Sequence, residues 1–216
     1  TGTDSVLSVI SFFADLVCTK CGRDYDRGSR FGVCPLPGCG APLFARYHDR
    51  PLDRDAASDR PRTIWRWREM MPVENEENVV SLGEGGTPLL PADRLGSDAG
   101  FTDLWIKDES GNPTGSFKAR GLSAAVSKGK ELGFRRIAVP SAGNAGGAAA
   151  AYAARAGMGC DVFLPDDTPG LFRIECERYG ASVTLVDGLI DACGKLVAQG
   201  AAEGKWHDVS TLKEPY

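Results

Sequence analysis

The chain has 216 residues, with 25 lysines and arginines against 29 aspartates and glutamates, and 42% of its residues are hydrophobic. This composition is close to that of average globular proteins, so it excludes disordered, collagen-like and coiled-coil chains. A formal net charge of −4 argues against nucleic-acid or membrane-surface partners. No apolar run approaches the roughly 20 residues that cross a bilayer, and the first residues lack the basic start of a secretory signal, so we expect a cytoplasmic protein. The one departure is glycine, which takes 27 positions and predicts many turns and close approaches.

The first part of the chain is rich in cysteine. Four of the seven cysteines, Cys18, Cys21, Cys34 and Cys39, have the spacing C-x2-C-x12-C-x4-C. Two facing turns of this kind can place four thiolates tetrahedrally around zinc. We therefore expect residues 1–48 to form a zinc-ribbon-like segment with a structural zinc ion, and the alternative is a set of reduced thiols without metal.

Residues 49–80 read as a linker. Arginines and aspartates alternate in its first half, so its basic residues are locally balanced by acidic ones and do not form a basic arm. Trp65 and Trp67 follow, and we expect a short helix that packs through these two side chains.

From residue 81 onward, short apolar runs alternate with helical stretches. Strands are predicted at 104–106, 136–139, 161–164 and 182–186, and helices at 117–132, 145–156, 171–179 and 189–202. This alternation predicts an α/β fold with a parallel sheet covered on both faces. Ligands of such sheets bind in the loops at the carboxyl ends of the strands.

Lys118 stands near the start of a predicted helix, directly after Phe117. The positive end of a helix and neighbouring apolar groups both disfavour a protonated amine, so we expect this lysine to act as a neutral nucleophile or base. The plainer alternative is an exposed lysine in a first helical turn, which is the usual place of a lysine.

The loop at 140–147, PSAGNAGG, joins a predicted strand to a predicted helix. Its small residues leave backbone N–H groups uncovered at a helix start, and such groups bind carboxylates or phosphates. The loop does not match GxGxxG, so a dinucleotide site has little support. The alternative is that the glycines serve only tight packing.

Four motifs together resemble, in order and spacing, the N-terminal half of the threonine synthase family. They are GEGGTPLL at 83–90, KDESGNPTGSFKARG at 107–121, SAGNAGGAAAAYAARAGM at 141–158 and ECERYGASVTLVDGLIDACGK at 175–195. Threonine synthases are pyridoxal-phosphate enzymes of the β-family, or fold type II. The resemblance implies that residues 81–216 are the N-terminal part of such a catalytic region. The cysteine-rich start is similar to the zinc-ribbon-like segment at the front of some members.

The resemblance also implies roles for single residues. Lys118 matches the lysine that holds pyridoxal phosphate as a Schiff base and later moves protons, and Phe117 would pack beside the cofactor. Asn144 matches the asparagine that binds the cofactor's ring hydroxyl, while Thr87 lies at the family's substrate-side entrance. The loop that receives the substrate carboxylate corresponds to Ser141, Gly143, Asn144 and Ala145. Many relatives have an aspartate directly after the lysine, where this chain has Ala119.

The implied reaction is that of a carbon–oxygen lyase acting on phosphate, which converts O-phosphohomoserine and water to threonine and phosphate. Lys118, as a free amine, would be the general base. Members of the family are commonly homodimers.

The family also uses a GGGTG-type loop that cradles the cofactor phosphate, and no segment of this sequence resembles it. We therefore expect a chain that lacks the C-terminal part of the catalytic region, binds the cofactor weakly and turns over little substrate.

Two alternatives remain open. One is another member of the β-family, such as a threonine or serine dehydratase or a synthase that uses phosphoserine. The other is a zinc-ribbon interaction module joined to an inactive α/β domain, against which the balanced charge of the first 80 residues counts.

Overall fold

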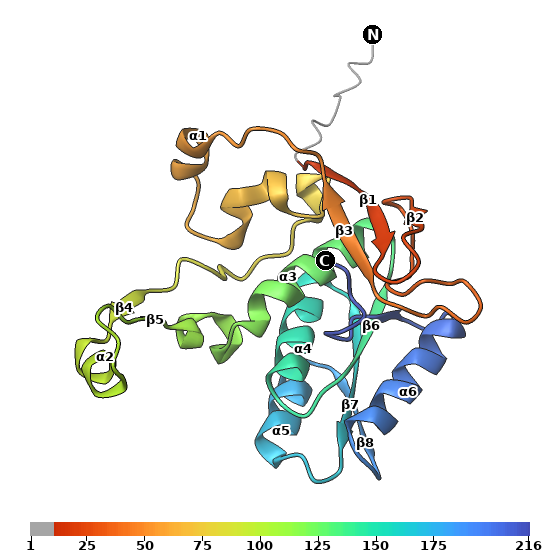
Figure 1. Cartoon of the computed structure of the whole chain (residues 1–216). Coiled ribbons are helices and arrows are strands. Elements are labelled where there is room, and N and C mark those ends of the chain that lie inside the picture. Colours follow the sequence, from red (N-terminus) through yellow and green to blue (C-terminus); the bar gives the residue numbers. More distant parts are fainter. Residues whose placement is uncertain (1–10) are drawn as a thin grey trace.

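The computed structural model describes residues 11–216, so the first ten residues of the predicted 1–48 segment lie outside the described range. Figure 1 shows a small sheet, β1 to β3, on one side of the molecule and a larger sheet, β6 to β8, with its helices below it. A ribbon of β4 and β5 with helix α2 projects on the opposite side.

The cysteine-rich segment folds as a three-stranded antiparallel sheet in the order β2-β1-β3. Its strands are β1 (Phe13–Cys18), β2 (Asp24–Tyr25) and β3 (Leu43–Tyr47). Phe13, Leu16 and Leu43 are buried beneath it together with Cys18 and Cys34. So small an apolar core supplies little stability by itself, which is the usual situation of segments that hold a metal.

The linker contains one short α-helix and two 3-10 helices: α1 (Arg54–Ser58), η1 (Ile64–Met70) and η2 (Glu76–Asn78). Thr63 precedes η1 and its side chain accepts a hydrogen bond from the Trp65 amide, which is the usual way a helix start is capped. Trp65 is buried as expected, whereas Trp67 is 39% exposed. The predicted short helix is therefore present, but only one of its two tryptophans is buried.

The larger sheet is fully parallel, in the order β8-β7-β6-β9. Its strands are β6 (Arg136–Pro140), β7 (Gly159–Pro165), β8 (Ser182–Val186) and β9 (His207–Asp208). Its helices are α3 (Lys118–Glu131), α4 (Asn144–Ala156), α5 (Gly170–Arg178) and α6 (Ile190–Ala202). The predicted α/β fold with a parallel sheet is confirmed.

Alternation along β6 divides the core between the two faces of the sheet, as the two-residue period of a strand requires. Ile137 and Val139 lie in the cluster that contains the buried residues of α3 and α4. Ala138 lies in the second cluster, with Cys193 and Val197 of α6. The sheet is thus covered on both faces.

One predicted strand lies elsewhere than the pattern indicated. Residues 104–106 were expected to join the parallel sheet, but β5 (Trp105–Lys107) pairs antiparallel with β4 (Leu89–Pro91) in a separate ribbon. Helix α2 (Asp93–Ala99) connects these two strands. All six strand residues are exposed. The expectation was wrong because sequence alternation shows that a strand forms but does not show which strand it pairs with.

The cysteine-rich sheet packs on the body of the molecule through buried Lys128 of α3. Its ammonium lies 2.8 Å from a carboxylate oxygen of Glu131 and 5.0 Å from the ring centre of Phe13. The ring of Phe13 also meets that of Tyr216 edge to face, with centres 5.7 Å apart. The segment is therefore joined to α3.

Within residues 11–216, no helix is both long enough and apolar enough to cross a membrane.

Candidate functional site

Lys118 is the first residue of α3 and is half-buried. Its amide donates to the hydroxyl of buried Ser116, and its ammonium lies 4.9 Å from the centre of the Phe117 ring. Among the described residues, no side chain or carbonyl forms a hydrogen bond or ion pair with this ammonium. The amine is therefore available to a ligand, beside an aromatic ring that is 58% exposed.

The backbone just before Lys118 is strained at Thr114. This residue has φ +65°, the only positive φ of a non-glycine residue in the described part of the chain. A β-branched residue is disfavoured there, and such strain gathers at functional sites. The Thr114 hydroxyl is also buried without a partner among residues 11–216. The segment before the lysine thus contains a hydroxyl that a ligand can satisfy.

The 141–145 loop lies at the carboxyl end of β6 and leads into α4. Ser141 is buried, and its hydroxyl accepts from the amides of Gly143 and Gly146 and donates to the Gly143 carbonyl. Gly143, at the N-cap of α4, has no side chain to cap it, Ser141 takes up only the Gly146 amide of the first turn, and Asn144 is exposed. Uncapped N–H groups at a helix start attract anions, so the loop is suited to a carboxylate.

Two glycines that follow this loop have a packing role. A Cβ at Gly146 would lie 2.9 Å from Val162 of β7, and one at Gly147 would collide with the Glu175 side chain. These glycines allow α4 to approach the sheet and α5. Tight packing, the alternative considered from the sequence, accounts for them.

Lys118 and the 141–145 loop lie at the same edge of the parallel sheet. Helix α4 begins where β6 ends, while α3 ends shortly before β6 begins and packs along α4. Both helices therefore start at the carboxyl edge, where α/β proteins bind their ligands.

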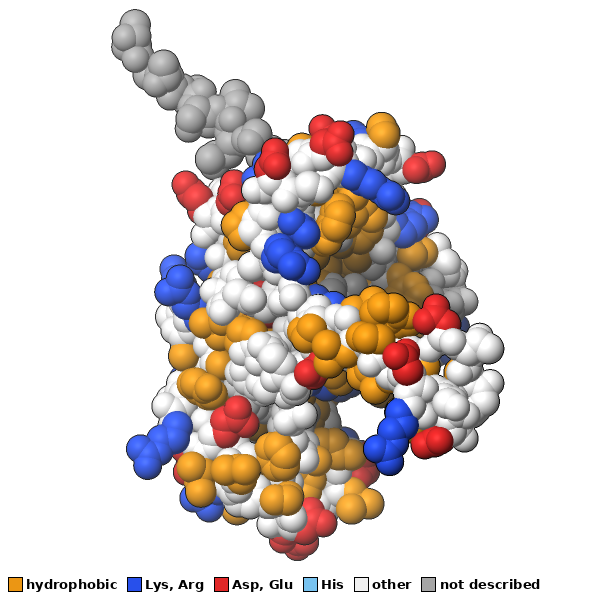
Figure 2. All heavy atoms as spheres, turned by 90° about the vertical axis from the view of Figure 1, so that its left-hand side faces the viewer, with side chains coloured by type: hydrophobic (Ala, Val, Ile, Leu, Met, Phe, Trp, Pro, Cys, Tyr) orange, Lys and Arg blue, Asp and Glu red, His pale blue; other side chains and the backbone are white. Residues whose placement is uncertain are grey.

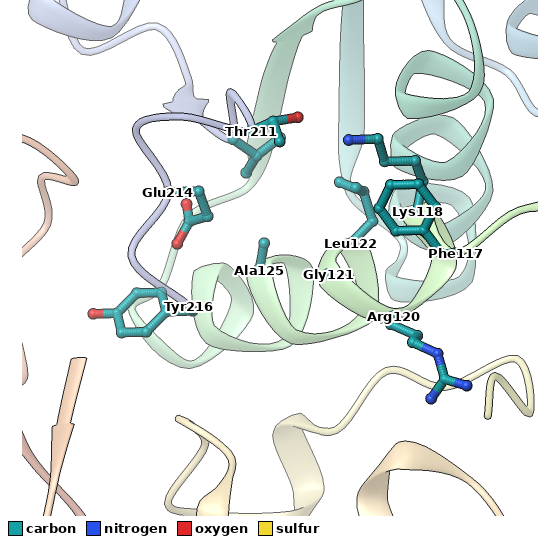
Figure 3. Close-up of a pocket in the computed structure, with 10 residues that line it drawn as sticks. Phe117, Lys118, Arg120, Gly121, Leu122, Ala125, Thr211, Glu214 and Tyr216 are labelled. Atoms are coloured by element: carbon teal, nitrogen blue, oxygen red, sulfur yellow. The ribbon is translucent and has the colours of Figure 1, made fainter. Parts of the chain in front are cut away.

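A cavity of about 230 Å³ lies beside Lys118, between α3 and the C-terminal segment. Phe117, Lys118 and Leu122 line it on the side of α3, and Thr211 and Tyr216 line it on the other (Figure 3). Ser141, Gly143, Asn144 and Ala145 are not among its lining residues. The structure thus brings Phe117 and Lys118 to one cavity, and the 141–145 loop lies outside it.

Thr87 lies in a different place from Lys118. Its hydroxyl donates to Glu109 at 2.6 Å and accepts from Arg120 at 3.1 Å, and it is only 6% exposed. Arg120 binds Glu109 through two nitrogens, at 2.6 and 2.8 Å. These hydrogen bonds, with that of Arg120 first, hold the pKa of Glu109 at about 2. A role of Thr87 at a substrate entrance remains a prediction.

Sequence reasoning missed Glu84, which is fully buried in the GEGG motif. One carboxylate oxygen accepts from Trp65 Nε1 at 3.0 Å and Ser123 Oγ at 2.7 Å. The other accepts from the Tyr152 hydroxyl at 2.6 Å and the Leu82 amide at 3.0 Å. Burial and this hydrogen bond raise the pKa of Tyr152. The sequence did contain one signal for this buried residue, because Glu84 is a charged residue within an otherwise glycine-rich motif.

The Glu84 network joins the linker, α3 and α4. The glycines beside Glu84 let the linker close on this loop, because a Cβ at Gly85 would lie 2.8 Å from the Ile64 amide nitrogen and one at Gly86 would collide with the Arg62 carbonyl. Both glycines have positive φ, at +112° and +59°. At these two positions, part of the glycine excess is explained by close contact with the linker backbone.

The side chains of the four clustered cysteines lie close together. Their sulfur atoms all lie within 4.8 Å of one another, with Cys18 and Cys39 3.6 Å apart and Cys21 and Cys34 3.8 Å apart. Four thiolates at about 2.3 Å from a tetrahedral zinc ion stand about 3.8 Å from each other. A backbone hydrogen bond from Cys21 lowers the pKa of Cys18 to about 6. The donor set and spacing fit zinc.

The side chains around Lys118 also fit an aldehyde cofactor with polar ring substituents. An unpartnered amine, an orphaned buried hydroxyl at Thr114 and a helix start without an N-cap side chain lie at one edge of the sheet. An amine can bind an aldehyde covalently, and the polar groups can hold ring oxygens and a carboxylate. The fold and this site define an α/β protein with a lysine amine, unpartnered among the described residues, at the carboxyl edge of a parallel sheet.

Comparison with known proteins identifies the group to which this arrangement belongs. The sequence model of the family described as "Pyridoxal-phosphate dependent enzyme" matches residues 80–216. The chain belongs to this family, with the fold of its fold type II members.

Individual relatives agree with this assignment. The threonine synthase of Methanocaldococcus jannaschii is 37% identical over 191 residues, which cover 86% of this chain and 46% of that protein. The threonine synthase of Methanosarcina acetivorans is 33% identical over 202 residues, covering 93% of this chain and 49% of that protein. The chain thus spans about half the length of these curated relatives, and the resemblance to threonine synthases is confirmed.

Among solved structures, a pyridoxal 5'-phosphate-dependent aspartate racemase is 32% identical, with a TM-score of 0.50. The match covers 57% of this chain and 39% of the racemase. The parallel sheet and its helices are therefore shared with enzymes of more than one reaction.

Proposed function

We propose that the chain is part of a threonine synthase and that Lys118 is its cofactor lysine. The observation that carries the proposal is the unpartnered amine at the start of α3, within a GSFKARG motif. Identities of 33 to 44% to threonine synthases of several species support the choice among family members.

The proposal gives each side chain a task. Lys118 would hold pyridoxal phosphate covalently, Phe117 would pack beside its ring and Asn144 would bind the ring hydroxyl. When bound, the cofactor supplies an electron sink for the substrate's Cα. The substrate carboxylate would lie in the loop of Gly143, Asn144 and Ala145 that Ser141 holds, with Thr87 toward the entrance.

The proposed reaction starts with removal of a proton from Cα of O-phosphohomoserine. The Lys118 amine takes that proton, because the motif places this amine at the carboxyl edge of the sheet without a partner among the described residues. A further proton leaves Cβ and phosphate leaves Cγ; protons then return to Cγ, which becomes the methyl group, and to Cα, and the hydroxyl of water adds at Cβ to give threonine. Removal of Lys118 therefore removes both the covalent anchor and the base.

The cofactor lysine can be tested on the chain itself. The chain is mixed with pyridoxal phosphate, reduced with borohydride and digested, and the modified lysine is identified by mass spectrometry. We expect the adduct on Lys118 and its loss in Lys118→Ala, with no change in Lys195→Ala, whose lysine is exposed on α6. An adduct spread equally over surface lysines would contradict the assignment.

The substrate needs a separate test with the protein at the full length of its relatives. Phosphate release from O-phosphohomoserine with formation of threonine is expected. Formation of an oxo acid from threonine or serine would favour a dehydratase, and loss of optical activity of an amino acid would favour a racemase, a second candidate that the 32% identity to an aspartate racemase supports.

We further propose that Cys18, Cys21, Cys34 and Cys39 bind a structural zinc ion. The proposal rests on the four sulfur atoms within 4.8 Å. Zinc would stabilise residues 1–48 as a unit distinct from the linker at 49–80 and the catalytic region at 81–216, because the apolar core of this unit is small.

A further inference from the structure

A second cavity lies on the other side of α3 from the Lys118 side chain. It has a volume of about 570 Å³, which falls within the usual range for small-molecule sites. Arg62, Arg66 and Trp67 of the linker form one wall, and Lys107 and Arg120 of the catalytic region line the other. Figure 2 shows a hollow on this face of the molecule, with basic side chains near it.

The cavity carries an excess of positive charge. Four basic side chains line it together with one carboxylate, that of Glu109. Arg120 pairs with this carboxylate through two short hydrogen bonds. Three cationic side chains remain without a compensating carboxylate in the lining.

Those three cations retain unused donors. Among residues 11–216, Arg62 has no ion pair and no side-chain hydrogen bond, and the Arg66 Nε atom is buried without a partner. The Lys107 ammonium donates only to the Thr87 carbonyl, at 2.5 Å. Arg66 also donates through Nη2 to the Ser58 and Arg60 carbonyls, so the donors left free for an anion in the cavity are mainly those of Arg62 and Lys107.

The remaining lining suits the body of an organic anion. Trp67 is 39% exposed, and Ile64 and Met71 line the cavity beside it. Guanidinium groups match the oxygens of a phosphate in pairs, and an indole face accepts a planar or apolar group. Charge and shape together favour a phosphate ester over a simple carboxylate.

The position of the cavity separates it from the cofactor lysine. Residues two apart on a helix point to opposite sides, and Figure 3 shows Arg120 directed away from Lys118. We propose that this cavity binds the phosphate group of a small metabolite and thereby joins the linker to α3. The cavity is distinct from the one at Lys118, although Arg120 lines both and Thr87, proposed at the substrate entrance, also lines this one.

Calorimetric titration of the chain with inorganic phosphate and with phenyl phosphate tests the proposal. We expect saturable binding of both probes, tighter for phenyl phosphate because its ring contacts Trp67. Arg62→Gln/Lys107→Gln is expected to weaken both probes about tenfold or more, since it removes two charged donors. Trp67→Ala is expected to weaken phenyl phosphate while leaving inorganic phosphate unchanged, which distinguishes an ester from the free ion.

Two controls make the result decisive. Arg94→Gln removes an exposed arginine of α2 outside this cavity, and Lys118→Ala removes the cofactor lysine; neither is expected to change phosphate binding. Circular dichroism melting checks the fold, and Arg62→Gln alone replaces the double variant if that one does not fold. No saturable binding, equal binding by the Arg62 variants, or loss of binding in Lys118→Ala would each overturn the proposal.

Discussion

The buried Glu84 network allows a sharp prediction about how the linker and two helices are held together. Glu84→Gln keeps the shape of the side chain but replaces one acceptor oxygen by an amide that donates. The glutamine side chain has one oxygen and one amide group. If the oxygen keeps the hydrogen bond from Tyr152, the amide group takes the place of the glutamate oxygen that accepted from Trp65 Nε1 at 3.0 Å and Ser123 Oγ at 2.7 Å. The donors of Trp65 and Ser123 then face the glutamine amide, which is itself a donor.

The magnitude follows from these contacts. A hydrogen bond to a charged group contributes about 1.5–3 kcal/mol, and the Tyr152 bond loses its charged acceptor as well. The Ser123 hydroxyl can turn to accept from the new amide, which recovers part of the loss. We therefore expect Glu84→Gln to lower the free energy of unfolding by about 3 kcal/mol.

Urea unfolding followed by tryptophan fluorescence and circular dichroism measures this change. With a slope of about 2 kcal/mol per molar urea, the midpoint is expected to fall by roughly 1.5 M. Glu76→Gln is the matched control, because that side chain is 70% exposed and its loss is expected to cost at most about 0.5 kcal/mol. A Glu84→Gln midpoint within about 0.3 M of the midpoint of the control variant would refute the reasoning, given a slope of ~2 kcal/mol per molar urea.

Three further results are expected. Gly86→Ala should lower the free energy of unfolding in urea melts by about 3 kcal/mol, because it combines positive φ with a collision against the linker carbonyl. Gly100→Ala, with open space around it, should lower it by about 1 kcal/mol. Equal losses would show that the linker does not pack against Gly86. The neighbouring arginine lowers the pKa of Glu109 from 4.5 to about 2, so the stability from this pair is present above pH 4.5 and lost as the pH falls toward 2. Glu109→Gln should remove that part of the acid sensitivity, and an acid-unfolding curve with unchanged pH dependence would contradict it. Chain purified without chelator should contain one zinc ion by metal analysis, with loss in Cys34→Ser and retention in Cys193→Ser; a metal-free chain would exclude the site.

The helices and strands of residues 81–216 were largely predictable. Runs such as Arg136–Val139 and 145–156 carry their periodicity locally, because each side chain's burial follows from its place on one strand or helix face. The shortest elements were missed. β4, with a proline among three residues, and two-residue β9 have no period to detect and exist only through pairing with β5 and β6.

The candidate site was predictable to the same extent. Motif spacing alone directed attention to Lys118, to the 141–145 loop and to the four cysteines, whose sulfur atoms the structure brings within 4.8 Å. The spacing did not reveal that Thr87 belongs to the Glu109 and Arg120 pair, since those hydrogen bonds cross 22 and 33 residues of sequence.

The sequence by itself determined the kind of protein: a cysteine-rich start, a parallel α/β region and a lysine in a family motif at a helix start. These features depend on residues near one another in the chain. Only the tertiary structure decided what buried Glu84 binds, which glycines admit the linker and where unpaired cations gather, because each depends on segments that meet in space after folding. Two of the glycines that the composition counted, Gly85 and Gly86, serve backbone contact between the linker and the GEGG loop.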